Sequence, residues 1–176
     1  NEQSAYEAVK HLLENGCKRI AFLAGPKSVS VSNQRRLGYL RALSEAGIQE
    51  DSSLIIHSDY FQDTATSQTH QLMTSPNPPD GILVVSDRLA LGVLVGMREL
   101  KVRVPEDVKI VSFNNEPICD VVSPTISSVA QPLEDIGKLA LKLLLDQIEG
   151  RSEVGEPVIE VLKTQLVIRE SSVSPN

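Results

Sequence analysis

The stretch GILVVSDRLALG, residues 81–92, joins a short aliphatic run to a Ser86-Asp87 pair and a second apolar segment. Comparable apolar runs occur at residues 20–25, 53–58 and 108–113. Each run has the length and the continuous hydrophobicity of a strand that is buried on both faces. The stretch therefore predicts one strand of a buried parallel sheet, and it places two polar residues where that strand ends.

Segments with helical spacing lie between these runs. Apolar residues recur at helical intervals over 37–43 in the first gap and over 89–100 in the third, whereas the second gap has only a thin apolar stripe. A strand and then a helix, repeated about every 30 residues, is typical of βαβ units, because parallel neighbours need a crossover of about a dozen residues. With a further helix before the first run, ending near Gly16, the pattern predicts an α/β fold with a parallel sheet flanked by helices.

The pattern changes after Asn115. The segment SPTISSVAQP, residues 123–132, is an extended stretch that contains two prolines, and residues 133–149 form an amphipathic helical pattern that ends at Gly150. The apolar stripe of this predicted helix consists of Ile136, Leu139, Ala140, Leu143, Leu144 and Ile148. The tail at 157–169 is rich in valine, isoleucine and leucine and predicts one or two closing strands.

The composition limits the partners of the chain. It has 176 residues, a net charge of −6 and 17 scattered lysines and arginines, so it lacks the basic stripe that follows a phosphate backbone. We expect one domain, or most of one, that does not bind nucleic acid by itself. Cys17 and Cys119 fit no metal spacing, and neither a signal peptide nor a membrane-spanning run is visible. These features predict buried thiols in a cytoplasmic protein without a membrane partner.

Polar side chains follow the predicted strands. The residues at the four ends are Gly25-Pro26-Lys27-Ser28, His57-Ser58-Asp59-Tyr60-Phe61, Ser86-Asp87-Arg88 and Asn114-Asn115-Glu116. In open α/β sheets, ligands bind in the crevice beyond the carboxyl ends of the strands. Amide, hydroxyl and carboxylate groups beside an aromatic pair suit a neutral polyhydroxylated ligand. Helix capping by Ser86 or Asp87, and turn formation by the two asparagines, explain these residues equally well.

Catalytic machinery is not recognisable in the sequence. His11, His57 and His70 lie in no nucleophile-elbow or HExxH pattern, and GxxxxGK(S/T) and GxGxxG loops are absent. Of the three histidines, only His57 is placed for a crevice, and a structural role explains it better than a role as general base. No carboxylate pair has a spacing that suggests acid-base catalysis. The sequence therefore favours a binding protein over an enzyme and indicates no cofactor and no metal.

Four segments, in this order and spacing, resemble the effector-binding region of the LacI/GalR family of bacterial transcriptional repressors. They are AVKHLLENGCKRIAFLAGP, NQRRLGYLRALSEAGI, PDGILVVSDRLALGVLVGMRELKVRVPEDVKIVSFNN and SPTISSVAQPLEDIGKLALKLLL, and they span nearly all of residues 1–150. The resemblance implies a two-lobed fold similar to that of periplasmic sugar-binding proteins, with the ligand between the lobes and DNA bound by a separate N-terminal helix-turn-helix. We expect residues 1–115 and about 157–170 to form the second lobe, and about 124–150 to form a crossover and a first-lobe helix. The helix-turn-helix and most of the first lobe are expected to lie outside this chain.

The resemblance also implies site residues. Arg35 in NQRRLGY matches the family's effector-contacting arginine, whose fork of donors suits adjacent hydroxyls or a carboxylate. In VVSD, Ser86 takes a position where the family often has asparagine, and Asp87 keeps the family's acidic residue. We expect Ser86 to face the crevice and Asp87 to cap its helix, with both among the ligand-binding residues.

Two more site residues come from the later segments. Asn114 in SFNN replaces a usual aspartate, which exchanges a charged acceptor for a weaker acceptor and a new donor. Gln131 in VAQP matches the family's glutamine at the cleft. Leu133 stands near a common aromatic position, so we expect Tyr60 or Phe61 to supply a ring against the ligand instead.

The resulting hypothesis is the sensing part of a transcription regulator, whose small polar effector, a sugar, changes DNA affinity elsewhere in the protein. A periplasmic sugar-binding transport protein of the same fold is the alternative, and the first residues of the whole gene product would separate the two. We also expect a homodimer, from the resemblance and from the nearly all-round apolar segment 89–100. The apolar stripe of 133–149 is expected to be buried, by another chain rather than by the chain's own sheet.

Overall fold

The computed structural model of the chain describes residues 1–151 and 159–173. Within these residues the strands form one six-stranded sheet in the order β2-β1-β3-β4-β5-β6. The strands are β1 (Ile20–Ala24), β2 (Ile55–His57), β3 (Gly81–Val84), β4 (Lys109–Asn114), β5 (Ser127–Ala130) and β6 (Gln165–Val167). All neighbouring strands are parallel except β6, which runs antiparallel to β5. The predicted parallel α/β sheet is therefore confirmed, with β6 as an antiparallel edge.

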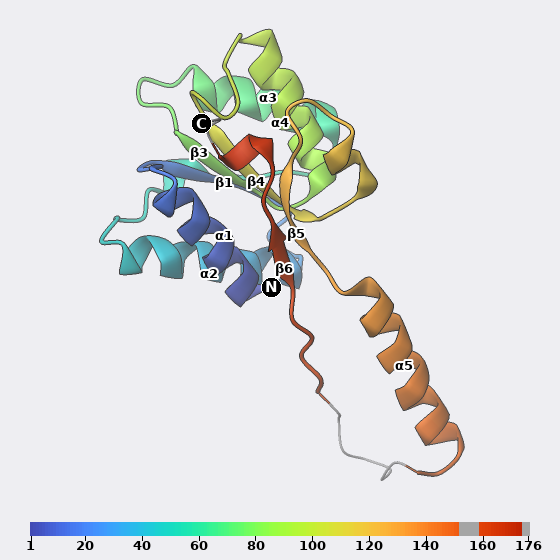
Figure 1. The fold of residues 1–176 in the computed structure, drawn as a ribbon. Helices are drawn as coiled ribbons and strands as arrows, with labels where there is room; N and C mark the ends of the chain where they lie inside the picture. Colours follow the sequence, from blue (N-terminus) through green and yellow to red (C-terminus); the bar gives the residue numbers. More distant parts are fainter. Residues whose placement is uncertain (152–158, 174–176) are drawn as a thin grey trace.

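Helices cover both faces of this sheet. The covering helices are α1 (Glu2–Glu14), α2 (Ser30–Glu45), α3 (Gln62–Met73) and α4 (Asp87–Glu99). A fifth helix, α5 (Leu133–Ile148), lies apart from the sheet, and the 3-10 turns are η1 (Ser52–Leu54), η2 (Pro117–Asp120) and η3 (Glu170–Ser172). Helices α1 and α2 pack together on one face, and α3 and α4 pack together on the other (Figure 1). None of the described helices is long and apolar enough to cross a membrane.

The core lies between the sheet and these two helix pairs. Every residue of β1 and β3 is buried, as expected for strands covered on both faces. Tyr39 of α2 is fully buried, stacks on Phe22 of β1 with ring centroids 5.5 Å apart, and donates its hydroxyl to the Ile20 carbonyl at 2.8 Å. Its hydrogen bond satisfies the one polar group that the ring brings into the core.

Helices α1 and α2 approach each other at Gly38. A Cβ atom added at this residue would lie 2.0 Å from the Glu2 carbonyl oxygen and 2.8 Å from the Tyr6 amide nitrogen. Both are backbone atoms of α1, so they cannot turn aside as a side chain would. The absence of a side chain at Gly38 is therefore what lets α1 pack on α2.

We expect Gly38→Ala to lower the free energy of unfolding by about 1–2 kcal/mol, as overpacking does, in spite of alanine's higher helix propensity. Urea denaturation followed by circular dichroism measures this loss. Gly137→Ala in α5 is the matched control, because a Cβ there would meet no atom of the described residues within 4 Å. Equal stability of Gly38→Ala and the unmodified chain would contradict the packing argument.

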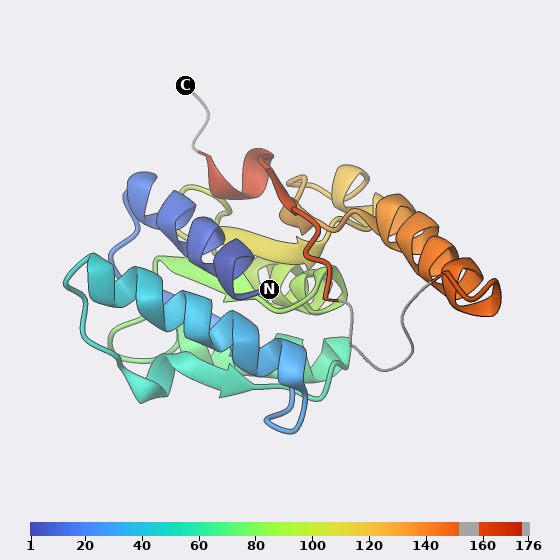
Figure 2. The same ribbon diagram turned by 90° about the horizontal axis from the view of Figure 1, so that it is seen from below.

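Helix α5 extends away from the rest of the chain (Figures 1 and 2). Within the described residues it contributes no buried side chain, and the exposed fractions of Ile136, Leu144 and Ile148 are 43%, 53% and 71%. The chain's own sheet thus leaves the predicted apolar stripe uncovered, and folding back is excluded for the chain as described. Burial by another chain stays a prediction.

The tail forms one of its expected closing strands. β6 pairs with β5, so that Gln165 lies opposite Ala130 and Val167 opposite Ser128. Residues 157 and 158 of the predicted tail lie outside the described residues. Beyond β6, η3 fixes the chain to the sheet, where Ser171 Oγ donates to the Ile110 carbonyl of β4 at 2.7 Å.

Candidate functional site

A cavity of about 390 Å³ lies where the sheet and α2 meet the outgoing α5. Arg35, Gln131 and Asn1 supply polar groups to its lining, and Phe113 and Val129 supply apolar surface from the sheet. The opposite wall comes from α5 and the segment before β6, through Ile136, Leu139, Ala140, Leu143, Glu160, Leu162 and Thr164. Four members of the apolar stripe of α5 therefore border this cavity.

Arg35 is the buried cation of the site. It lies in α2 with only 4% of its surface exposed, and its guanidinium carbon stands 3.9 Å from the centroid of the Phe113 ring. Its Nε donates to Asn1 Oδ1 at 3.2 Å, and its Nη1 donates to the carbonyl of Val85 just beyond β3. Burial lowers the pKa of Arg35 to about 10, against the opposing effect of Tyr60 and Asp87. The group is therefore still a cation at neutral pH.

Asn114 and Gln131 form a pair at the ends of two neighbouring strands. Gln131 Nε2 donates to Asn114 Oδ1 at 3.0 Å. The backbone of Asn114 has a φ of 106° and that of Asn115 a φ of 55°, so both residues form a turn in the left-handed region. The turn role that the sequence allowed for the two asparagines is confirmed, and it brings Asn114 to the residue that lines the cavity.

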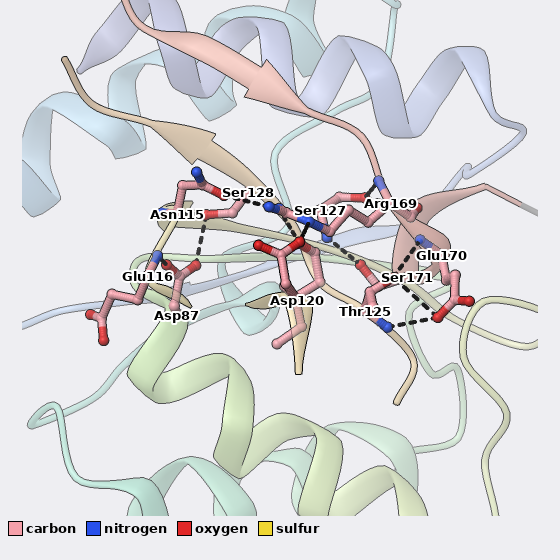
Figure 3. Close-up of polar contacts among 11 residues, drawn as sticks. Asp87, Asn115, Glu116, Asp120, Thr125, Ser127, Ser128, Arg169, Glu170 and Ser171 are labelled. Atoms are coloured by element: carbon pink, nitrogen blue, oxygen red, sulfur yellow. Dashed lines mark hydrogen bonds and ion pairs between the residues drawn. The ribbon is translucent and has the colours of Figure 1, made fainter. Parts of the chain in front are cut away.

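Neither Ser86 nor Asp87 has the role expected for it. Ser86 is the N-cap of α4, and its Oγ accepts a hydrogen bond from the Leu89 amide at 3.5 Å. The expectation that Asp87 caps the helix was wrong. Asp87 has no exposed surface, and its carboxylate instead accepts from Ser112 Oγ. It also accepts from Ser128 Oγ at 2.7 Å and from the Glu116 amide at 2.7 Å (Figure 3).

These contacts change what the two residues can do. Because both oxygens of Asp87 are engaged inside the chain, the carboxylate joins α4 to β4 and β5 and presents no free oxygen to a ligand. Ser86 is 9% exposed and uses its oxygen as a cap. Among the described residues, neither side chain lines the cavity.

Tyr60 and Phe61, from which a ring against the ligand was expected, have different environments, and neither is among the described residues that line the cavity. Tyr60 has a φ of 68° and places its hydroxyl against Gly25, where a Cβ atom would lie 2.1 Å from that oxygen. Phe61 is 69% exposed, and its amide donates to Asp59 Oδ1 at 3.1 Å. Of the two rings, Tyr60 is thus held against the loop after β1, while Phe61 is largely exposed.

Phe113 and Asn1 belong to the site, although the sequence did not single them out. Phe113 precedes Asn114 at the end of β4 and supplies the aromatic face on which Arg35 stacks. An aromatic residue next to a polar strand end was the available signal. Asn1 gave no signal, since its contact with Arg35 depends on how α1 packs against α2.

The cysteines and His57 have structural environments. Cys17 and Cys119 are buried and free, and burial raises the pKa of each thiol to about 12. His57 Nδ1 lies 2.9 Å from the Gly25 carbonyl oxygen, which fixes the loop after β1. Within residues 1–151 and 159–173, no group of three or more histidine, cysteine or acidic side chains could hold a metal ion.

Comparison with known proteins finds a matching domain family and similar transcriptional regulators. Residues 9–172 match the model of the periplasmic binding protein-like domain. The chain is 35% identical to the HTH-type transcriptional repressor CytR of Escherichia coli K12 over 172 residues, which are 98% of this chain and 50% of CytR. It is 36% identical to catabolite control protein A of Priestia megaterium over 144 residues, 81% of this chain and 43% of that protein. The chain thus spans about half the length of the curated relatives it matches.

A solved structure has the same fold as this chain. The complex of the transcriptional regulator CelR with cellobiose is similar to this chain with a TM-score of 0.89 and 34% sequence identity. The similarity covers 97% of this chain and 51% of the CelR chain. The fold around the cavity is therefore shared with a protein whose structure was solved with a disaccharide.

Proposed function

The chain belongs to the LacI/GalR family of transcriptional regulators, whose effector-binding domain it contains in part, and we propose that it senses a small polar ligand, a sugar, for such a regulator. The regulator acts in the cytoplasm as a repressor, and a helix-turn-helix elsewhere in the whole protein binds operator DNA. The name of CytR as a helix-turn-helix repressor supports this assignment. It is a binding function without a catalytic step.

The observation that carries the proposal is the buried guanidinium of Arg35 in the lining of the cavity. Its planar fork can donate to two neighbouring hydroxyls of a sugar. Gln131 offers an amide at the same cavity and holds Asn114 beside it, so that donors and acceptors converge. The ring of Phe113 adds an apolar face, which suits the C–H surface of a pyranose or furanose.

The position of the cavity supports a regulatory mechanism. One wall belongs to the sheet and α2, and the other belongs to α5 and the segment before β6. A ligand that contacts both walls has a different affinity for different arrangements of them, and it shifts their populations accordingly. Such a shift, transmitted to the DNA-binding part, is how the effector changes operator affinity.

Calorimetry of the full-length protein tests this function. We expect one mono- or disaccharide of a panel that includes cellobiose and D-glucose to bind with saturation, and to change the affinity for promoter DNA from upstream of the protein's own gene. A set of ribonucleosides serves as the comparison, because a nucleoside shares the hydroxyls of the ribose but adds a base. Binding of nucleosides alone would contradict a saccharide effector, and binding without any effect on DNA affinity would contradict a regulator.

A homodimer is the second part of the proposal. Leu91, Leu94 and Val95 of α4 are only half-buried and border an apolar groove together with Ile118 and Val122. The helix is apolar on nearly all sides, as expected, but the side that carries these three residues is not covered by the described part of the chain. Apolar side chains gathered in this way on a protein surface are typical of an interface, so we propose that a second copy packs here.

We expect Leu94→Ala to raise the dissociation constant of the dimer about tenfold, because a truncated apolar anchor at an interface costs more than about 1 kcal/mol. Sedimentation equilibrium measures this constant. Leu37→Ala is the matched control, since Leu37 is a half-exposed leucine of α2 outside the groove. If the unmodified chain is a single 19.2 kDa species at high concentration, the proposed dimer of this chain is contradicted.

A further inference from the structure

The turn that holds Asn114 is strained and fastened from several sides. Its two residues have φ values of 106° and 55°, which side chains other than glycine adopt at a cost. Ser128 Oγ accepts from the Asn115 amide at 3.0 Å, and Asp87 accepts from the Glu116 amide. These bonds fix the backbone of the turn after Asn114. They leave the side chain of Asn115 to be fixed by another group.

Arg169 supplies that group from the C-terminal segment. Its Nη2 donates to Asn115 Oδ1 at 2.8 Å, its Nη1 donates to the Ile126 carbonyl at 2.9 Å, and its Nε donates to Asp120 Oδ1 at 2.7 Å (Figure 3). The guanidinium side chain is 12% exposed, whereas that of Asp120 is 65% exposed. One largely buried cation therefore joins the turn, the start of β5 and η2.

The backbone of Arg169 is itself held against β5. Its amide donates to Ser127 Oγ at 2.7 Å, and the same hydroxyl lies 3.0 Å from the Arg169 carbonyl oxygen. The guanidinium is thus presented from a fixed base. Because it bonds both the turn after β4 and the carbonyl at the start of β5, it relates the strand that carries Asn114 to the strand that leads to Gln131.

We propose that Arg169 is a positioning residue of the effector site. It acts through Asn115 on the contact between Asn114 and Gln131 and does not touch the effector, since among the described residues it does not line the cavity. The inference rests on the proposed function insofar as Asn114 and Gln131 are taken to meet the ligand. Its structural part, the control of the Asn114–Gln131 contact by Arg169, can be tested without any ligand.

The test uses three single variants of the intact protein and the Arg169→Gln/Asn115→Gly double variant. Arg169→Gln removes the cation, and Asn115→Gly removes the acceptor while keeping a residue that tolerates positive φ. Asp120→Asn is the control, because it removes only the exposed charge partner of Arg169. The first readout is the ¹⁵N spectrum of the side-chain amides of Asn114 and Gln131. The second is calorimetry with cellobiose, D-glucose and the other saccharides of the panel.

We expect Arg169→Gln and Asn115→Gly to shift the amide signals of Asn114 and Gln131, and Asp120→Asn to leave them in place. Each of the first two variants should weaken saccharide binding about tenfold, and the double variant should bind no more weakly than either, since both act through one contact. If no saccharide binds, the proposed function fails while the amide signals still decide the positioning role.

Unchanged amide signals in Arg169→Gln would overturn the inference even if that variant were less stable, because a purely structural role changes stability alone. If Arg169→Gln does not fold, Asn115→Gly decides the matter by the same two readouts. Additive losses of affinity in the double variant would also overturn it, since they would mean that Arg169 does not act through Asn115.

Discussion

Replacing Arg35 by alanine is expected to weaken effector binding by about 1.5–3 kcal/mol, or roughly ten- to 150-fold, the value of hydrogen bonds made by a charged group. The guanidinium is the charged donor in the described lining of the cavity, and it is already oriented by Phe113, Asn1 and the Val85 carbonyl. An oriented donor binds a ligand without first losing side-chain entropy. Calorimetry with the saccharide that binds the unmodified protein measures the loss.

The same burial means that Arg35→Ala also lowers stability. The truncation leaves the Val85 carbonyl without its side-chain donor and the ring of Phe113 without its cover. Arg35→Met separates the two effects, because it keeps an apolar chain over Phe113 while removing the donors. Arg36→Ala is the matched control, since that neighbouring arginine is directed to Glu50 at 3.1 Å on the surface. Equal affinity of Arg35→Met and the unmodified protein would contradict a role in binding.

The sheet could be predicted from the sequence because burial on both faces leaves a direct pattern. β1 and β3 are continuous apolar runs, and the gaps between runs are long enough for crossover helices. The shorter β2, with η1 before it and half-buried residues, lies at the edge of the sheet. The apolar run at 53–58 predicted a longer strand than the three residues of β2. An edge strand has a neighbouring strand on one side only, so fewer of its residues are held in the sheet.

The role of the Ser86-Asp87 pair could not be predicted from its immediate neighbours. Serine and aspartate are both preferred caps, so local preference cannot say which of two adjacent residues begins the helix. Which residue caps the helix depends on the hydrogen bonds that Asp87 accepts from Ser112 and Ser128. These serines lie 25 and 41 residues away along the chain and meet Asp87 only when β4 and β5 pair. Long-range partners of this kind leave no periodic pattern in a sequence.

The exposed stripe of α5 has a different origin. The amphipathic pattern predicted a helix at 133–149, and α5 forms at Leu133–Ile148, since the pattern depends only on its own residues. What covers the apolar face depends on a surface that lies beyond the chain's own sheet. Sequence periodicity indicates that a face needs a partner, but it does not identify that partner.

Removal of the Asp87 carboxylate is expected to cause a large loss of stability. Asp87→Ala leaves the buried hydroxyls of Ser112 and Ser128, and the part-buried amide of Glu116, without their acceptor. A buried donor without a partner costs about 1–3 kcal/mol, so we expect the free energy of unfolding to fall by about 3–5 kcal/mol. Urea denaturation measures the change.

Two variants show whether the network or the helix causes this loss. Asp63 stands in the first turn of α3 as Asp87 does in α4, but it is exposed, so Asp63→Ala removes a similar interaction with a helix dipole and should change stability far less. Asp87→Asn should lose less than Asp87→Ala, because the amide oxygen can still accept from Glu116 while the serine hydroxyls rotate to accept from the amide nitrogen. Similar losses in Asp63→Ala and Asp87→Ala would mean that the helix dipole dominates. The buried carboxylate would then have no special part in joining α4 to the strands that carry the site.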